Sequence, residues 1–303
     1  MIKVGCCGYP VAAEKYYKAF GLVEINKTFY EFPRMATVEK WREKAPVDFE
    51  FTVKAHKSIS HQHKLDASEP CLEAFEQART ICEVLKAKIL LVQTAASFAP
   101  DKIDVATNFF RKISRDDLAV VWETRGSAWE TKDVRERLAN MLQNVGVSHV
   151  TDLFKALPVY TDGVAYFRLH GLGKDMYYYQ YTDEELMKLY EVLRTFEAKG
   201  KEVYVLFNNL AMFDDALRFK QFLRTQKFPK ITSSVGLESV KSVIEKTRYP
   251  IAKAVLLKRF GWRLVELENG KQVRLGELLK DLPRKEYGSA EEVLKAVKPL
   301  IKS

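Results

Sequence analysis

The sequence predicts an α/β protein built on a TIM-type (β/α)₈ barrel, with a small basic α+β appendage after it. Three observations lead to this fold class. Residues 1–228 contain eight β-rich runs, nearly all separated by helical patterns. Most runs are continuously apolar, as expected when both faces of a parallel sheet are covered. The length of this region, residues 1–228, is typical of one barrel. An open doubly wound sheet is the alternative, but the sequence does not supply its glycine-rich phosphate fingerprint.

The expected strands are rich in β-branched and aromatic residues and are bounded by turn-forming residues. They cover residues 2–9, 22–28, 49–56, 88–94, 118–125, 148–152, 164–170 and 202–208. Helical spacing of apolar residues predicts the intervening helices at 11–20, 35–44, 69–86, 101–113, 133–145, 182–199 and 214–226. Thr182 and Glu185 have the spacing of a capping box. Residues 153–163 are too short and too proline-broken to hold a full helix.

Residues 229–303 form the predicted appendage, so we expect a domain boundary between residues 228 and 229. Helical patterns cover 233–246 and 251–260. Residues 262–268 and 272–275 alternate as strands around Asn269 and Gly270, a pair that favours a type I′ hairpin turn. Ser289 and Glu292 have capping-box spacing ahead of a last helix that reaches about residue 301.

The composition of the 303 residues is typical of a globular protein. No apolar run approaches the length of a membrane span, so no membrane partner is expected. The first nine residues lack the basic and apolar regions of a signal peptide, which predicts a cytoplasmic location. Cys6, Cys7, Cys71 and Cys82 lack the spacing of a zinc site and are expected to be small buried residues.

Polar side chains recur at the carboxyl ends of the expected strands, where ligands bind in parallel α/β sheets. Residues two apart on a strand share a face, so alternation shows which side chains point the same way. Pairs with this spacing are Glu24 with Asn26, Lys54 with His56, Glu123 with Arg125, and Arg168 with His170, and Asn208 ends the last strand. We therefore predict that these side chains converge as one polar cluster inside the barrel mouth.

The residue types in this cluster suit a small anionic ligand, such as a phosphate or a carboxylate. The predicted substrate-binding residues are Asn26, Lys54, His56, Arg125, Arg168 and Asn208. Arginine can hold such an anion through two parallel hydrogen bonds. The predicted catalytic residues are Glu24, Glu123 and His170, since carboxylates and imidazoles serve as general acids and bases. The alternative is a structural salt-bridge network that neutralises buried charges.

The acidic residues also suggest a divalent metal ion as cofactor. Glu24, Glu123, Asp152 and His170 lie at the ends of separate expected strands and supply oxygen and nitrogen ligands. These ligand types suit Mg²⁺, Mn²⁺ or Zn²⁺. The spacing along the sequence does not decide whether this metal site forms, because the four residues are far apart in the chain.

Several motifs resemble one family when they are taken in order along the chain. Residues 23–61, VEINKTFYEFPRMATVEKWREKAPVDFEFTVKAHKSISH, resemble the signature of the YecE-like proteins, the domain-of-unknown-function-72 family. The segments VGCCGY, VVWETR, YFRLHG and VYVLFNN add further matches, so the resemblance covers residues 1 to about 225. It implies a TIM barrel and no established activity. Some members carry a label relating them to sugar isomerases, which rests on fold analogy.

Positive charge is concentrated in the appendage. Residues 229–303 hold 16 Lys and Arg against 9 Asp and Glu, a net charge of +7 out of +9 for the chain. Such a basic region favours a polyanionic partner, nucleic acid first, and a solvated lysine-rich surface is the alternative. The predicted nucleic-acid-binding residues are Lys258, Arg259, Arg263, Lys271 and Arg274.

Three functions follow from these features. The first is phosphodiester hydrolysis on nucleic acid, with the carboxylates and His170 around a metal ion or an activated water. The second is an isomerase or lyase reaction on a small sugar phosphate, with Glu24 or Glu123 as base. The third is a non-catalytic module that binds an anionic metabolite or a nucleic-acid-processing partner. The oligomeric state is left open by the sequence.

Overall fold

The computed structural model describes residues 1–301, and its internal contacts divide the chain into two compact units. The first unit consists of Met1–Leu169 and Leu189–Asn208. The second consists of His170–Lys188 and the described residues from Asn209 onward. The units therefore alternate along the chain. No helix among the described residues is long and apolar enough to cross a bilayer.

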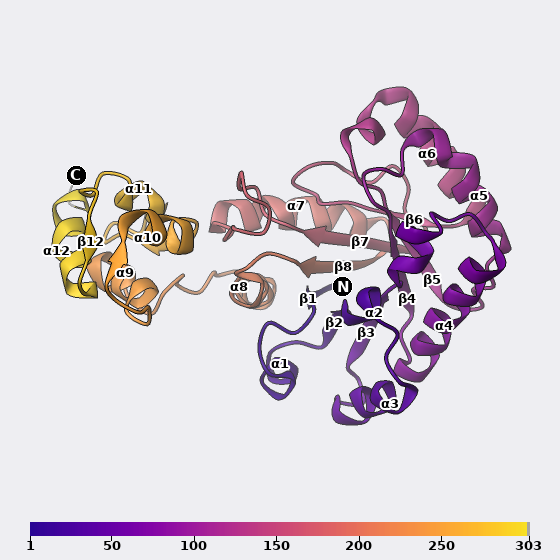
Figure 1. Cartoon of the computed structure of the whole chain (residues 1–303), viewed down its shortest axis with the longest axis horizontal. Coiled ribbons are helices and arrows are strands. Elements are labelled where there is room, and N and C mark those ends of the chain that lie inside the picture. Colours follow the sequence, from indigo (N-terminus) through magenta and orange to yellow (C-terminus); the bar gives the residue numbers. More distant parts are fainter. Residues whose placement is uncertain (302–303) are drawn as a thin grey trace. The chain divides into compact units, whose positions relative to one another are not determined.

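Eight parallel strands of the first unit form the predicted barrel (Figure 1). They are β1 (Ile2–Cys7), β2 (Leu22–Ile25), β3 (Glu50–Lys54), β4 (Ile89–Gln93), β5 (Ala119–Glu123), β6 (Ser148–Val150), β7 (Val164–Leu169) and β8 (Glu202–Phe207). Neighbouring strands pair in the order β6-β5-β4-β3-β2-β1-β8-β7. A bridge between Thr151 and Phe167 joins the two ends of this order, so the sheet closes on itself.

Helices follow most of the strands, and all seven helices predicted for residues 1–228 are confirmed. They are α1 (Ala13–Ala19), α3 (Met35–Lys44), α4 (Glu69–Leu85), α5 (Ile103–Lys112), α6 (Lys132–Val145), α7 (Asp183–Ala198) and α8 (Met212–Thr225). Four short additions are α2 (Lys27–Tyr30), a π-helix at Ser58–Gln62, and 3₁₀ turns at Pro100–Lys102 and Ser127–Glu130. Residues 153–163 lack a helix, as predicted. Figure 1 shows α4, α5 and α6 outside the strands.

Side chains fill the barrel in layers, as is usual for this fold. Near the amino ends of the strands, Lys3 Nζ pairs with Glu50 and Glu202 and donates to the hydroxyl of Tyr204. The middle is apolar and aromatic, and Tyr166 stacks there on Tyr204 with ring centroids 5.9 Å apart. The polar side chains therefore lie at the carboxyl end of the barrel, above this apolar middle. The alternation of residues along the strands predicts that position.

The C-terminal part of the second unit is an α+β structure with its own apolar core, as predicted. Its elements are α9 (Gly236–Ile244), β9 (Ile251–Ala252), α10 (Lys253–Phe260), β10 (Leu264–Glu266), β11 (Gln272–Arg274), α11 (Leu275–Leu279), β12 (Glu286–Tyr287) and α12 (Ala290–Ile301). The capping box before α12 forms in part, since the Glu292 N–H donates to Ser289 Oγ over 3.2 Å.

Two local predictions in this part are wrong. The turn between β10 and β11 is not type I′, because that turn needs positive φ at both central residues. Only Gly270, at φ +79°, meets that condition, and the Gly270 N–H donates to the carbonyl of Leu267. This pattern indicates a type I turn followed by a left-handed glycine. The expected helix 251–260 begins as a strand, because β9 pairs with β12.

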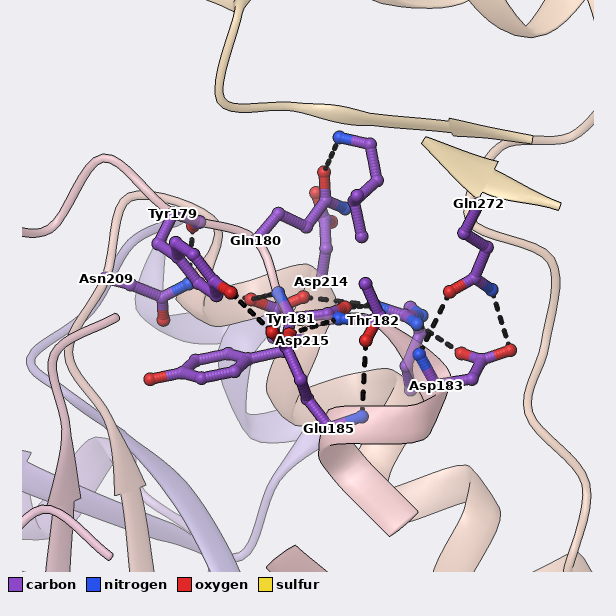
Figure 2. A network of polar contacts seen from close by, with 12 residues as sticks. Tyr179, Gln180, Tyr181, Thr182, Asp183, Glu185, Asn209, Asp214, Asp215 and Gln272 are labelled. Atoms are coloured by element: carbon purple, nitrogen blue, oxygen red, sulfur yellow. Dashed lines mark hydrogen bonds and ion pairs between the residues drawn. The ribbon is translucent and has the colours of Figure 1, made fainter. Parts of the chain in front are cut away.

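Hydrogen bonds join the 170–188 segment to the C-terminal part of the same unit (Figure 2). The Asp183 carboxylate accepts from Arg218 and from Gln272 Nε2, and the Asp183 N–H donates to Gln272 Oε1 over 2.9 Å. Gln180 Oε1 accepts from the backbone of Leu264 over 2.9 Å. Residues 89 positions apart in the chain thus hold one another in place.

Candidate functional site

Arg168 is the centre of the polar cluster at the carboxyl ends of the barrel strands. Its side chain comes from β7 and is almost fully buried. Nε and Nη2 donate to the two carboxylate oxygens of Glu24, on β2, over 3.0 and 2.8 Å. This confirms that Glu24 and Arg168 meet inside the barrel. Burial opposes the charge of Arg168, but the neighbouring carboxylates outweigh it and hold the pKa of Arg168 well above its usual value.

Glu123 joins the same network from the end of β5. Its Oε2 accepts from Arg168 Nη1 over 2.6 Å, and its Oε1 pairs with Arg125 Nη2 over 2.6 Å. Gln93 and Asn26 add side-chain oxygens to Arg168 at 3.2 and 3.5 Å. Two buried carboxylates are therefore neutralised by two guanidinium groups. We call these residues, together with Lys54, the mouth cluster.

These contacts decide what Arg168 can do. Separating it from its partners to clamp a ligand would break a buried ion pair, which costs about 3–5 kcal/mol. A charged hydrogen bond to an anion returns about 1.5–3 kcal/mol. The geometry therefore favours a structural role for Arg168, in which it orients Glu24 and Glu123.

The layer beneath supports the network. The Tyr166 hydroxyl donates to Glu24 Oε2 over 2.8 Å and lies 2.7 Å from Thr52 Oγ1. Cys7 is buried, and burial raises the pKa of its thiol well above the usual value. The thiol therefore stays protonated. All four cysteines are buried thiols, as predicted.

Lys54 is the third cation of the mouth cluster, and its amine, unlike the two guanidinium groups, has no acidic partner. It ends β3 and is 7% exposed, and among the described residues it forms no ion pair or side-chain hydrogen bond. Its Nζ lies 4.0 Å from the centre of the Phe29 ring. Burial, and then the charge of Arg168, lowers its pKa to about 8, although Glu24 and Glu123 oppose the shift. A fraction of the Lys54 amines is therefore neutral near physiological pH.

One histidine contacts the same phenylalanine ring as this lysine. His61 belongs to the π-helix after β3, and its ring packs edge-on against Phe29 at 5.0 Å. Burial, and then the charge of Lys54, lowers the pKa of His61, so its imidazole is neutral at pH 7. The sequence favours an ordinary surface histidine at this position, because His61 follows the strand in a loop, where strand alternation gives no signal.

Other predicted site residues have local roles. His56 stacks on Phe32 with ring centroids 4.2 Å apart, and its Nδ1 lies 2.8 Å from Ser58 Oγ. Asp152 Oδ1 accepts from the Phe154 N–H in a turn after β6. The Asn208 N–H donates to the Leu169 carbonyl and so extends the pairing of β8 with β7.

The predicted metal ligands do not assemble. No group of three or more His, Cys, Asp or Glu within residues 1–301 has a geometry that could hold a metal ion. The physical reason is that Glu24 and Glu123 bind Arg168 instead. Asp152 bonds within its own turn, and His170 is buried in the second unit. The set Glu24, Glu123, Asp152 and His170 thus does not fit a cation.

The predicted nucleic-acid-binding residues differ in their surroundings. Lys258, Arg259 and Lys271 are exposed. Arg263 pairs with Asp214 over 3.4 Å, and Arg274 donates to the carbonyls of Gln180 and Trp262. Arg263 and Arg274 therefore also hold the second unit together.

Comparisons with known proteins agree with this barrel. The sequence pattern of the family described as "Protein of unknown function DUF72" matches residues 12–235, and that of "Family of unknown function (DUF5789)" matches 234–303. The UPF0759 protein YunF of Bacillus subtilis is 26% identical over 238 residues, which cover 69% of this chain and 84% of YunF.

Two crystal structures show the same fold. A DUF72 family protein of Enterococcus faecalis V583 is 24% identical with a TM-score of 0.62, over 74% of this chain and 98% of that one. A DUF72 family protein of Thermotoga maritima MSB8 is 26% identical with a TM-score of 0.58, over 74% of this chain and 99% of that one. With its eight parallel strands and a family match over most of its length, this chain belongs to the DUF72 family, whose function is unknown.

Proposed function

We propose that the barrel catalyses an isomerase or lyase reaction on a small anionic carbonyl compound of the sugar-phosphate class, with Lys54 as the reactive amine. One observation carries this proposal: Lys54 is buried at the carboxyl end of a barrel strand without an acidic partner. Arg168 and Arg125, by contrast, are both paired with carboxylates. Catalytic residues of TIM barrels lie at this end of the strands.

The chemistry follows from the state of the amine. A lysine that is desolvated and placed next to another cation becomes a nucleophile near neutral pH. The neutral Lys54 nitrogen attacks the carbonyl carbon and forms a carbinolamine. The carbinolamine loses its oxygen as water and takes up one proton from solvent, so a protonated imine remains. That imine withdraws electrons from the adjacent carbon, so a proton or a carbon fragment can depart from it. The neutral imidazole of His61, which contacts the same Phe29 ring as Lys54, is the base proposed to accept that proton.

Charge favours an anionic substrate. Arg125, Arg168 and protonated Lys54 contribute three positive charges, and Glu24 and Glu123 contribute two negative charges. The mouth cluster thus has a net charge of +1 when Lys54 is protonated, and the protonated imine restores this charge after the neutral amine has reacted. Positive potential in a low-dielectric site attracts phosphate and carboxylate groups.

Phosphodiester hydrolysis, the first function predicted from sequence, receives less support from this geometry. It needs Glu24 and Glu123 to hold a metal ion or activate a water, and both carboxylates already bind Arg168. The basic C-terminal region remains the observation in its favour. Non-catalytic binding is the outcome expected if no reaction can be trapped at Lys54.

Reductive trapping tests the proposal. The full-length protein is incubated with dihydroxyacetone phosphate, glyceraldehyde phosphate or pyruvate, then reduced with borohydride and mapped by mass spectrometry. We expect a stable adduct on Lys54 with at least one probe, because borohydride converts the imine to a secondary amine. Lys54→Met should lose the adduct, and Lys57→Met, three positions along the chain, should keep it. An adduct spread over many lysines, or none on Lys54, would reject the carbonyl mechanism.

A further inference from the structure

A pocket in the second unit shares no residue with the mouth cluster and is not explained by the proposed reaction. Its volume is about 620 Å³, within the range of about 300–1,000 Å³ found for small-molecule sites. The residues that matter for its chemistry are Lys174, Tyr178, Tyr179, Lys258, Trp262 and Arg274. They come from the loop after β7, from α10 and from the β10–β11 region.

The walls of this pocket are held in place. Arg274 Nη1 donates to the carbonyls of Gln180 and Trp262 over 3.2 and 3.1 Å, and its guanidinium lies 4.0 Å from the centre of the Tyr179 ring. Hydrogen bonds of Gln180 with β10 and of Asp183 with β11 hold the end of the same loop (Figure 2). Gly171, at φ +91°, lets the loop pass close to Tyr179, since a Cβ there would lie 2.4 Å from the Tyr179 Cβ.

Positive charge dominates the pocket. Lys174, Lys258 and Arg274 line it against one acidic residue, Asp175. Lys174 and Lys258 are exposed, and neither forms an ion pair within residues 1–301. Arg274 is already committed to backbone carbonyls, so the two lysines are the cations that can meet a ligand. Two mobile ammonium groups suit a phosphate.

Aromatic surface faces the same pocket. Tyr178 is 41% exposed and meets Trp262 edge-on, with ring centroids 6.2 Å apart. The exposed face of Tyr178 offers a stacking surface to a planar ring, because aromatic side chains stack on nucleobases.

We propose that this pocket binds a nucleotide, with the base against Tyr178 and Trp262 and the phosphate at Lys174 and Lys258. The aromatic and cationic walls call for an aromatic ring that is joined to an anionic group. A free mononucleotide and a nucleotide unit of a single-stranded nucleic acid share this chemistry. The pocket lies wholly within the second unit, so the proposal stands independently of the reaction at Lys54.

Calorimetric titration of the full-length protein with adenosine monophosphate, adenosine and single-stranded oligoadenylate tests the site. We expect adenosine monophosphate to bind about tenfold more tightly than adenosine, because a charged hydrogen bond is lost without the phosphate. Lys258→Ala and Lys174→Ala should each weaken binding by a similar factor. Lys298→Ala removes one exposed positive charge from the same unit outside the pocket and should leave binding unchanged.

Tryptophan fluorescence provides a second readout. Binding should change the emission of the wild-type protein, and Trp262→Phe should lose most of that change. Equal affinity for the mononucleotide and the oligonucleotide, with equal sensitivity to Lys258→Ala, assigns the site to a free nucleotide. Much tighter binding of the oligonucleotide assigns it to a nucleic-acid strand. Absence of binding by every probe, an equal loss in Lys298→Ala, or unaltered Trp262 emission at saturation would each overturn the proposal.

Discussion

At the scale of single residues, two buried cations in one barrel have opposite electrostatic situations. Arg168 has carboxylates on two sides and stays charged. Lys54 has no such partner, and its pKa falls to about 8. A buried charge without a partner costs free energy, so Lys54 is expected to destabilise the fold. Retaining a costly lysine at the barrel mouth is consistent with a functional demand, since strained and costly groups gather at active sites.

The first prediction concerns the stability cost of Lys54. Lys54→Met should raise the free energy of unfolding at pH 7 by about 3 kcal/mol. This value follows from the lowering of the Lys54 pKa from 10.5 to about 8 on folding, because one pKa unit corresponds to about 1.4 kcal/mol. Below pH 8 the amine is protonated in both states, so the cost is fully present. Between pH 8 and 10.5 the unfolded chain binds more protons, so the cost diminishes as pH rises. Urea unfolding of both proteins from pH 6 to 10.5 measures this, and a pH-independent difference would exclude the lowered pKa.

At the scale of elements, strand alternation and helix caps determined much of what could be predicted. Glu24, Glu123 and Arg168 were placed in one cluster because each shares a face with its neighbours two residues away. Which cation would remain unpaired could not be predicted, because pairing depends on distances across the closed barrel. The hydrogen bonds of Asp183 with Gln272 could not be predicted either, because the sequence carries no signal that links such distant residues.

The second prediction concerns the cap of α7. The Glu185 N–H donates to Thr182 Oγ1 over 3.2 Å, and the Thr182 N–H donates to Glu185 Oε2 over 2.8 Å, which confirms the predicted capping box. Thr182→Ala should lower the free energy of unfolding by about 1 kcal/mol. Thr195→Ala, inside the same helix, is the matched control and should change stability little, because alanine favours helix interiors. Chemical denaturation compares them, and equal effects would argue against a capping contribution.

At the scale of the whole molecule, the two compact units alternate along the chain. The loop after β7 and helix α8 belong with the C-terminal residues and not with the barrel strands that precede them in sequence. The predicted domain boundary between residues 228 and 229 stays a prediction, namely that the two parts fold as separate domains. Cutting there would remove the partners of Gln180 and Asp183 on β10 and β11.

The third prediction follows from this arrangement. In a fragment of residues 1–228, the backbone amides of 171–183 should exchange hydrogen faster than in the full chain, because their tertiary partners are missing. Helix α4 serves as the internal control, since its residues lie within the first unit, and its exchange should stay the same. Hydrogen exchange with mass spectrometry measures both segments. Equal protection of 171–183 in the two proteins would show that the C-terminal part does not stabilise this loop.

The central claim is that Lys54 carries a reactive amine, and the pH dependence of its acetylation tests this most directly. Full-length protein is treated with a limiting amount of acetic anhydride at a series of pH values, and modification of each lysine is measured by peptide mass spectrometry. Because only the neutral amine reacts, the normalised Lys54 profile should reach half its maximum near pH 8. A short unstructured peptide with one lysine, added to the same samples, should follow the ordinary lysine pKa of about 10.4. A Lys54 profile that coincides with that of the added peptide would contradict the account.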